Sequence, residues 1–300
     1  MMHEMNKFKL WNNIVGWMVF FIATASYILT IEPTTSLWDC SEFIATSYKL
    51  EVGHPPGAPL FMMLARIASL FAPSVESVPM MINAMNGVAS GFCILFLFWT
   101  ITHLARRITT RNDGEPMSFS RMVLILGAGA VGALSYAYTD TFWFSAVEGE
   151  VYALSSMFTA LVVWLMLKWE ENAHRATSMR WIILIAYLMG LSIGVHILNL
   201  LTIPALVMIW FFRRYEYRTA WDYVAKIALA LVVSLLILGA INGIIIPYTV
   251  ALGAAVDTFV VNSLGMPVNS GMILFAVAVF ALLGYAIMFT HRKGYRTLNG

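Results

Sequence analysis

Apolar residues gather into long runs along this 300-residue chain, and short polar segments separate the runs. A helix needs about 20 apolar residues to cross roughly 30 Å of hydrocarbon. The pattern therefore predicts an all-α polytopic membrane protein with about eight transmembrane helices. The predicted spans cover approximately residues 14–31, 80–104, 121–141, 150–168, 181–194, 196–212, 226–247 and 271–290.

Three segments need a more specific interpretation. Residues 180–212 are too long for one ordinary crossing, and two glycines together with Pro204 favour a tight helical hairpin. Residues 57–71 are shorter and contain Arg66, so we expect them to lie at the membrane interface or to be re-entrant. We expect residues 248–270 to form a short outer segment between the last two spans.

Composition supports a membrane protein and argues against other classes. Hydrophobic residues make up 60% of the chain and charged residues 11%, whereas soluble domains are about 25% charged. The net charge of +2 comes with cations in the membrane-flanking loops, so we expect no nucleic-acid partner. Cys93 lies in an apolar run and Cys40 in a loop, so we expect no intramolecular disulfide.

The basic residues predict the orientation in the membrane. If the N-terminus is cytoplasmic and residues 57–71 do not span, all of the 18 Lys and Arg residues except Lys49 and Arg66 lie on the cytoplasmic side. If residues 57–71 did span, the basic clusters would face outwards. We therefore expect cytoplasmic N- and C-termini, and we expect residues 32–79 to form the longest extracytoplasmic loop.

Residues 37–50 of this loop predict an amphipathic juxtamembrane helix on the outer surface, with Ser36 as its N-cap. At about 100° per residue, its polar face contains Asp39, Glu42, Thr46 and Lys49. The opposite face contains Leu37, Ile44 and Tyr48. Asp39 and Glu42 are an i, i+3 pair with Cβ atoms about 5–6 Å apart, although an ordinary solvated face would have the same spacing.

The prolines that follow cannot continue a helix, and the turn they form should hold His54 near the membrane surface. Arg66 lies in an apolar stretch where an unpaired charge is unfavourable. We expect it to need an anion, either a carboxylate such as that of Asp39 or a bound phosphate. An ordinary ion pair or snorkelling is the structural alternative.

A second acidic segment, EGEVY, starts at Glu148 where the fourth span begins. In a helix Glu148 and Tyr152 share a face, and Glu150 points elsewhere. With the carboxylates of the first outer loop, this segment predicts an acidic outer cavity, for which Asp140 is a further candidate. Carboxylates at a helix N-terminus also suit the macrodipole, so a structural role stays open.

His196 and Asn199 lie near the outer tip of the predicted hairpin, where a histidine can be either structural or functional. The chain contains no Walker motif, no H-E-x-x-H, no C-x-x-C and no glycine-rich dinucleotide loop. Nothing in the sequence therefore indicates ATP, zinc or NAD.

Residues 38–60, WDCSEFIATSYKLEVGHPPGAPL, resemble the domain-of-unknown-function 2723 family, which is protein O-mannosyltransferase-like and belongs to the GT-C glycosyltransferase superfamily. Residues 148–154, EGEVYAL, and 194–201, GVHILNLL, are similar to it too. The resemblance covers about residues 30–270. It implies that residues 1–300 form a single GT-C-like transmembrane domain, the N-terminal part of a longer architecture. The site would lie in residues 32–79.

The resemblance also implies an activity. A GT-C enzyme moves a sugar, here mannose or another hexose, from a polyprenyl-phosphate donor to a protein Ser or Thr hydroxyl on the extracytoplasmic face, with inversion. The expected partners are the lipid bilayer, that donor and the acceptor protein. Because the family is common in Bacteroidetes, a bacterial cytoplasmic membrane is expected. In the mannosyltransferases Asp and Glu are adjacent, whereas here Cys40 follows Asp39 and the second acid is Glu42.

Asp39 and Glu42 are thus the predicted catalytic pair, with Asp39 as the base for the acceptor hydroxyl. Substrate or phosphate binding is assigned to Lys49, His54, Arg66, Glu148, Glu150, Tyr152, His196 and Asn199. No metal ligand is assigned, and a divalent metal is possible but not required. A transporter, which would place charges near the bilayer midplane, and a non-catalytic scaffold subunit are the alternative interpretations.

Overall fold

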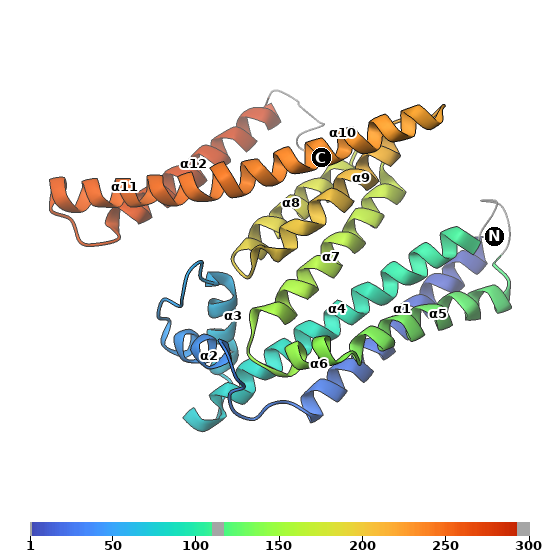
Figure 1. Cartoon of the computed structure of the whole chain (residues 1–300), viewed down its shortest axis with the longest axis horizontal. Helices are drawn as coiled ribbons and strands as arrows, with labels where there is room; N and C mark the ends of the chain where they lie inside the picture. Colours follow the sequence, from blue (N-terminus) through green and yellow to red (C-terminus); the bar gives the residue numbers. More distant parts are fainter. Residues whose placement is uncertain (1, 110–116, 293–300) are drawn as a thin grey trace. The chain divides into compact units, whose positions relative to one another are not determined.

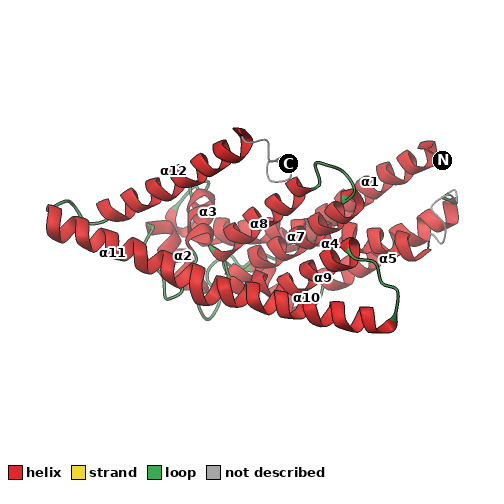
Figure 2. Ribbon diagram, turned by 90° about the horizontal axis from the view of Figure 1, so that it is seen from above, coloured by secondary structure: helices red, strands yellow, loops and turns green. Residues whose placement is uncertain are grey.

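The computed structural model describes residues 2–109 and 117–292. These residues form helices and no β-strand (Figure 2), so the predicted all-α class is confirmed. Arg111, Lys293 and Arg296 of the predicted cytoplasmic set lie outside the described residues. The chain divides into two compact units, of which the first contains residues 1–168 and 184–202 and the second contains residues 169–183 and 203–300.

The first unit is built on three long helices that lie side by side (Figure 1), namely α1 (Met2–Leu29), α4 (Val78–Thr109) and α5 (Phe119–Ala137). The shorter helices α2 (Cys40–Lys49) and α3 (Pro59–Ser69) pack against the first part of α4. The short helical turn η1 (Val75–Ser77) lies immediately before α4 in the chain. The remaining elements are α6 (Asp140–Val147) and parts of α7 (Val151–Asn172) and α8 (Met179–Ile193), followed by η2 (Ile197–Thr202).

Small residues bring the three long helices into close contact. A Cβ atom at Gly91 of α4 would lie 1.9 Å from Thr24 Oγ1 of α1, and one at Gly129 of α5 would lie 2.4 Å from Thr102 Cγ2 of α4. Small residues at such positions are how helices associate in a bilayer, where apolar burial between helices gives little driving force. The buried core that they enclose includes Val19, Ala23, Tyr27, Ile94, Phe98, Ile125 and Ala133.

The second unit contains α9 (Ile203–Arg214), α10 (Ala220–Ala240), the π-helical turn η3 (Ile241–Ile245), α11 (Ile246–Leu264) and α12 (Ser270–Arg292). Helices α11 and α12 pack against each other. Asp257 of α11 accepts hydrogen bonds from the backbone N–H groups of Asn269, Gly271 and Met272, with the shortest at 2.8 Å to Gly271. The N-terminus of α12 is therefore satisfied by a side chain of α11.

Within the described residues, seven helices are long and apolar enough to cross a membrane. They cover Lys7–Leu29, Val75–Thr109, Phe119–Ala137, Val151–Asn172, Ile197–Arg214, Ala220–Leu264 and Ser270–Arg292. The protein is thus a multi-pass integral membrane protein. Helix α8, with 15 residues, is shorter, and a break before Ile197 separates it from the next helix, which agrees with two helices in residues 180–212.

Two other expectations differ in outcome. Helix α3 has 11 residues and is about 16 Å long, too short to cross the bilayer, which agrees with an interfacial or re-entrant segment.

The expected outer segment at residues 248–270 is wrong, because one helical run continues from Ala220 to Leu264. The wide π-helical turn just before Pro247 relieves the clash that a proline makes in a regular helix. The run ends only at Gly265, whose φ of 65° is left-handed.

Candidate active site

Helix α2 carries the first acidic residues of the site. It begins at Cys40 after Trp38, whose φ is 67°, and Asp39 occupies the N-cap position without a side-chain cap bond. The predicted N-cap role of Ser36 is wrong, because its hydroxyl donates to a carboxylate oxygen of Glu148 instead. Phe43 on the apolar face of α2 is buried in a hydrophobic cluster with residues of α3, α4 and α7, so the helix is held against the rest of the first unit.

The predicted faces of this helix need two corrections. Thr46 is buried rather than part of the polar face, and its hydroxyl donates to the Glu42 carbonyl oxygen at 2.7 Å, which satisfies it without water. Leu37 is 80% exposed and lies before the helix, because the helix starts three residues later than expected. Ile44 is buried, as predicted for the apolar face.

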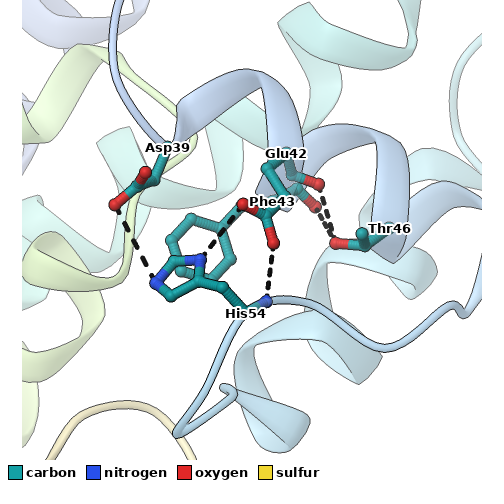
Figure 3. Close-up of polar contacts among 5 residues, drawn as sticks. All are labelled: Asp39, Glu42, Phe43, Thr46 and His54. Carbon is teal, nitrogen blue, oxygen red and sulfur yellow. Dashed lines mark hydrogen bonds and ion pairs between the residues drawn. The ribbon is translucent and has the colours of Figure 1, made fainter.

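Asp39, Glu42 and His54 come together at the start of α2 (Figure 3). Glu42 holds His54 twice, because Oε1 accepts from the His54 backbone N–H at 2.6 Å and Oε2 lies 3.1 Å from its Nδ1. On the other side of the imidazole, Nε2 lies 4.0 Å from Oδ2 of Asp39. The segment between α2 and His54 thus returns the histidine to the acidic end of α2, and the three side chains form one cluster.

The electrostatics of this cluster are mutually supporting. The backbone N–H of His54 holds the pKa of the Glu42 carboxyl below its ordinary value. The hydrogen bond and the negative charge of Glu42 raise the pKa of His54, with smaller contributions from Asp39 and Glu150. The imidazolium form of His54 is therefore favoured beside two carboxylates.

The two predicted outer cations lie elsewhere in the loop. Lys49 Nζ is 3.9 Å from a carboxylate oxygen of Glu51, and both side chains are exposed. Arg66 stacks over the ring of Tyr48 at 5.1 Å and donates to Ser69 Oγ at 3.3 Å. Its described partners are thus an aromatic ring and a hydroxyl, and the Asp39 carboxylate that we expected is not one of them.

The second acidic segment is a turn, not the start of a helix. Glu148 has extended backbone angles of −125° and 159°, and α7 begins only at Val151. The fully buried Asn86 of α4 donates from Nδ2 to the carbonyl oxygens of Glu148 and Glu150, at 2.6 Å each. The i, i+4 argument for Glu148 and Tyr152 was therefore wrong, because a side-chain amide holds this backbone in a non-helical turn.

A neighbouring amide, that of Asn83, fixes the chain that leaves α1. Its Nδ2 donates to the carbonyl oxygens of Glu32 at 2.6 Å and Thr34 at 3.1 Å. Gly149 fits tightly beside it, since an added Cβ atom would lie 2.9 Å from Asn83 Oδ1 and 3.0 Å from Ile44 Cγ1. One turn of α4 thereby positions both acidic segments.

These segments line an open acidic cavity of about 840 Å³. The prediction that Glu150 points elsewhere is wrong, because Glu150 lines this cavity together with Asp39 and Glu148, and the expected contribution of Asp140 is confirmed. Aromatic rings form much of the remaining wall. The lining residues are Leu37, Trp38, Asp39, Tyr136, Thr139, Asp140, Thr141, Phe142, Phe144, Ser145, Glu148, Glu150, Tyr152 and Ser156.

Burial changes the ionisation of the two glutamates, which are 5% and 6% exposed. Desolvation raises the pKa of Glu148, although the Ser36 hydroxyl partly opposes this shift. Desolvation, helped by the charges of Glu148 and Asp39, raises the pKa of Glu150 to about 7. The cavity can therefore hold a protonated carboxyl, able to donate a hydrogen bond, beside ionised ones near neutral pH.

A second, more apolar cavity of about 660 Å³ adjoins the first. The two share Tyr136, Tyr152 and Ser156 in their linings. The walls of the second cavity come from α4, α5 and α7, which are candidate membrane spans. Its other lining residues are Cys93, Leu97, Thr100, Ile101, Gly132, Ser155, Thr159, Ala160, Val163 and Leu198.

His196 and Asn199 lie beside this region in different environments. Asn199 is fully buried, donates to Ser192 Oγ at 2.7 Å and accepts from Thr159 Oγ1 at 3.1 Å, so its amide joins α7 to η2 and α8. The His196 ring lies 5.5 Å from that of Tyr152, and burial lowers its pKa. Neither side chain lines the acidic cavity.

Sequence reasoning missed Asn83 and Asn86, although both carry the geometry of the site. The signal was present as two amides three residues apart inside an apolar run, and such residues share one face of a helix. Polar side chains within a predicted span are expected to face protein rather than lipid.

Comparison with known proteins identifies the family. A family model described as "Protein O-mannosyl-transferase TMEM260 N-terminal domain" matches residues 39–219, more than half of the chain. The chain belongs to this family. The match to the TMEM260 N-terminal domain begins at Asp39 and includes all ten residues predicted for the site.

Two curated relatives carry corresponding names. The chain is 25% identical over 197 residues to "Protein O-mannosyl-transferase tmem260" of Dictyostelium discoideum, covering 64% of this chain and 22% of that protein. It is 27% identical over 190 residues to "Protein O-mannosyl-transferase TMEM260" of Mus musculus, covering 63% and 24%. The chain thus spans less than a quarter of the length of these relatives. No solved structure matches it.

Proposed function

We propose that this protein is a membrane glycosyltransferase that transfers a hexose, in the first instance mannose, to a Ser or Thr hydroxyl of an acceptor protein. The observation that supports it most directly is the position of Asp39. This residue lines the acidic cavity and faces His54, and it lies within the region matched by the TMEM260 family. The relatives' names supply the reaction class.

The chemistry requires a base because an alcohol is a weak nucleophile. Asp39 takes the hydroxyl proton as the acceptor oxygen forms a bond to the anomeric carbon. The bond between that carbon and the phosphate oxygen breaks, and the phosphate leaves with the electron pair. Attack from the side opposite the phosphate inverts the anomeric centre. A positioned general base contributes about 10²–10⁴-fold to such a step.

The lining of the cavity suits a sugar. Carboxylates accept hydrogen bonds from sugar hydroxyls, and Glu148 and Glu150 supply them from a turn that Asn86 fixes. Aromatic side chains such as Trp38 and Phe144 offer flat apolar faces to the C–H groups of a pyranose ring. We assign hexose binding to this cavity on these grounds.

For the donor we propose a polyprenyl-phosphate sugar. Its support is the apolar cavity between α4, α5 and α7, which adjoins the acidic one at Tyr136, Tyr152 and Ser156. An isoprenoid chain would occupy the apolar cavity, and its phosphate would lie near the boundary. The raised pKa of His54 favours an imidazolium that can stabilise the leaving phosphate.

We further propose that the site faces the extracytoplasmic side of a bacterial cytoplasmic membrane, with both termini in the cytoplasm. The bias of Lys and Arg between loops supports this orientation. We also propose that residues 1–300 form one GT-C-like domain at the N-terminal end of a longer architecture. The description of the matching family as an N-terminal domain supports this assignment.

The deciding experiment compares intact masses of extracytoplasmic proteins from cells that lack the gene and from complemented cells. Wild type should restore a hexose-sized mass that the deletion loses. Asp39→Asn should lower the rate of transfer by about 10²–10⁴-fold. The control is Glu51→Gln, which removes an exposed carboxylate of the same loop and should complement fully.

The other outcomes contradict specific parts of the proposal. If Asp39→Asn complements as well as wild type, the base assignment is wrong. If the deletion changes no glycan, the transferase proposal fails, and the transporter and scaffold interpretations take its place. Immunoblots of membrane fractions must show equal insertion of all variants.

A further inference from the structure

The two glutamates of the turn before α7 line the acidic cavity with different partners. Glu148 accepts a hydrogen bond from the Ser36 hydroxyl, and this donor favours its ionised form. Glu150 is more than nine-tenths buried, and its Oε2 accepts from Val151 N–H at 3.2 Å. No described hydrogen bond reaches its Oε1. This oxygen of Glu150 is therefore the one left for a ligand in the cavity.

The charges around Glu150 favour its neutral form. The carboxyl groups of Asp39, Asp140 and Glu148 line the same cavity, and its described lining contains no Lys, Arg or His. The His54 imidazole lies 4.0 Å from Asp39 and outside this lining, and its opposing effect on Glu150 is the smallest. Negative neighbours and burial both favour the protonated form of an acid.

The other elements that form the cavity wall add no charge. The phenols of Tyr136 from α5 and Tyr152 from α7 complete the titratable groups of the described lining. The contact from α4 is the amide of Asn86, which donates to the backbone of the turn. The described part of the cavity thus has no cation of its own for an anionic ligand.

A phosphate-bearing donor, which is part of the proposed function, would bring a further negative charge to this cavity. Ionised carboxylates repel a phosphate at close range, and they have no proton with which to bind it. A neutral carboxyl removes one repelling charge and offers an O–H donor to a phosphate oxygen. Because burial raises the pKa of Glu150 to about 7, this residue can accept a proton near neutral pH.

We propose that the donor phosphate binds together with one proton, which Glu150 takes from solvent and presents to a phosphate oxygen through Oε1. Its Oε2 keeps the hydrogen bond from Val151 N–H. Glu148, ionised beside Ser36, still accepts from sugar hydroxyls. The bound proton offsets the charge that the phosphate adds to the cavity. The identity of the ligand rests on the proposed function, whereas proton-coupled binding of a phosphodiester does not require transfer.

The test measures binding of a mannosyl farnesyl phosphodiester to the full chain in detergent by isothermal titration calorimetry, between pH 5.5 and pH 8.5. The phosphate of this probe does not titrate in that range, so any pH dependence comes from the protein. For the wild type, the dissociation constant should rise about tenfold for each pH unit above 7 and change little below pH 6. Titrations at pH 8 in two buffers of different ionisation enthalpy should report the uptake of about one proton per bound probe.

Single variants identify the group that takes up the proton. Glu150→Gln should bind the probe equally well at every pH, because its amide donates a hydrogen bond without titrating. Glu148→Gln removes a charge from the same cavity and should keep the slope of the wild type. His54→Gln removes the other group beside Asp39 whose pKa is raised and should keep the slope too. Glu51→Gln, at an exposed position, should match the wild type.

A second measurement depends on no variant. The infrared difference spectrum of the wild type on binding the probe at pH 8 should show the carbonyl stretch of a newly protonated carboxylic acid. The proposal is overturned by any of four results: no binding of the probe at any pH, no proton uptake, an unchanged slope in Glu150→Gln, or loss of the slope in His54→Gln.

Activity separates this proposal from the proposed function. If the probe binds with uptake of a proton and no acceptor protein receives a hexose, the transferase proposal fails alone. If the wild type transfers hexose from the probe while its binding is independent of pH, the proton-coupled site fails alone.

Discussion

At the scale of single residues, Glu150 is where burial changes the chemistry most. Its pKa rises from about 4.5 to about 7 because the folded protein removes it from water. The folded state therefore binds a proton more tightly than the unfolded state. Its contribution to stability is fully present below pH 4.5 and is lost as the pH rises through 7.

Glu150→Gln should consequently raise the melting temperature at pH 8 and have little effect at pH 5. The expected gain in unfolding free energy at pH 8 is on the order of 1–2 kcal/mol, less than the full shift because the site is partly solvated. Thermal unfolding in detergent with a chelator present measures it. Glu51→Gln, at an exposed position, should show no such pH dependence. An equal effect of Glu150→Gln at both pH values would contradict the assigned burial.

The sequence predicted which residues belong to the site better than it predicted how those residues are arranged. The acids of the first loop and of the Glu-Gly-Glu segment were predicted to form one acidic cavity, and His54 was predicted to bind substrate or phosphate. Their arrangement was not, because Ser36 and Asn86 override local helix patterns with long-range hydrogen bonds to the segment around Glu148. A periodicity argument considers only neighbours along the chain, so it cannot detect such partners.

At the scale of elements, the contact between α4 and the turn before α7 carries the second acidic segment. Asn86→Ala would leave the carbonyl oxygens of Glu148 and Glu150 without their described side-chain donor, in a buried environment. We expect a loss of about 1–3 kcal/mol of unfolding free energy.

Asn242→Ala is the matched control for this prediction. The amide of Asn242 is exposed, and its described hydrogen bond goes to the Leu238 carbonyl oxygen, at 3.0 Å within its own helical run. Its removal should change the unfolding free energy by less than about 0.5 kcal/mol. Denaturation followed by circular dichroism compares the two variants, and equal losses would contradict a clamp at Asn86.

The sequence predicted helices well where the length of an apolar run determines them. It predicted them poorly where a local backbone feature determines where the helix ends. The spans near residues 80–104 and 121–141 correspond to α4 and α5 within a few residues. The run through Pro247 was missed because a local π-helical turn, which has no pattern of apolar residues, accommodates that proline.

At the scale of the whole molecule, the orientation in the membrane makes a direct prediction. Glu51→Cys should react with a membrane-impermeant maleimide on intact cells. Arg218→Cys, between α9 and α10, should react only after permeabilisation. The native Cys40 and Cys93 are buried and free, so they should give little background. The opposite labelling pattern would show that the topology is inverted.

The tight fit of Gly149 offers a way to recognise this site in other sequences. A side chain at that position would press on Ile44 and on an Asn83 amide that two carbonyl groups already hold in place. Two glutamates separated by a larger residue could form the same turn only if Ile44 or the held Asn83 amide shifted. A glycine between two such acids is therefore the residue that leaves this packing undisturbed, and its presence favours a chain that builds the same cavity.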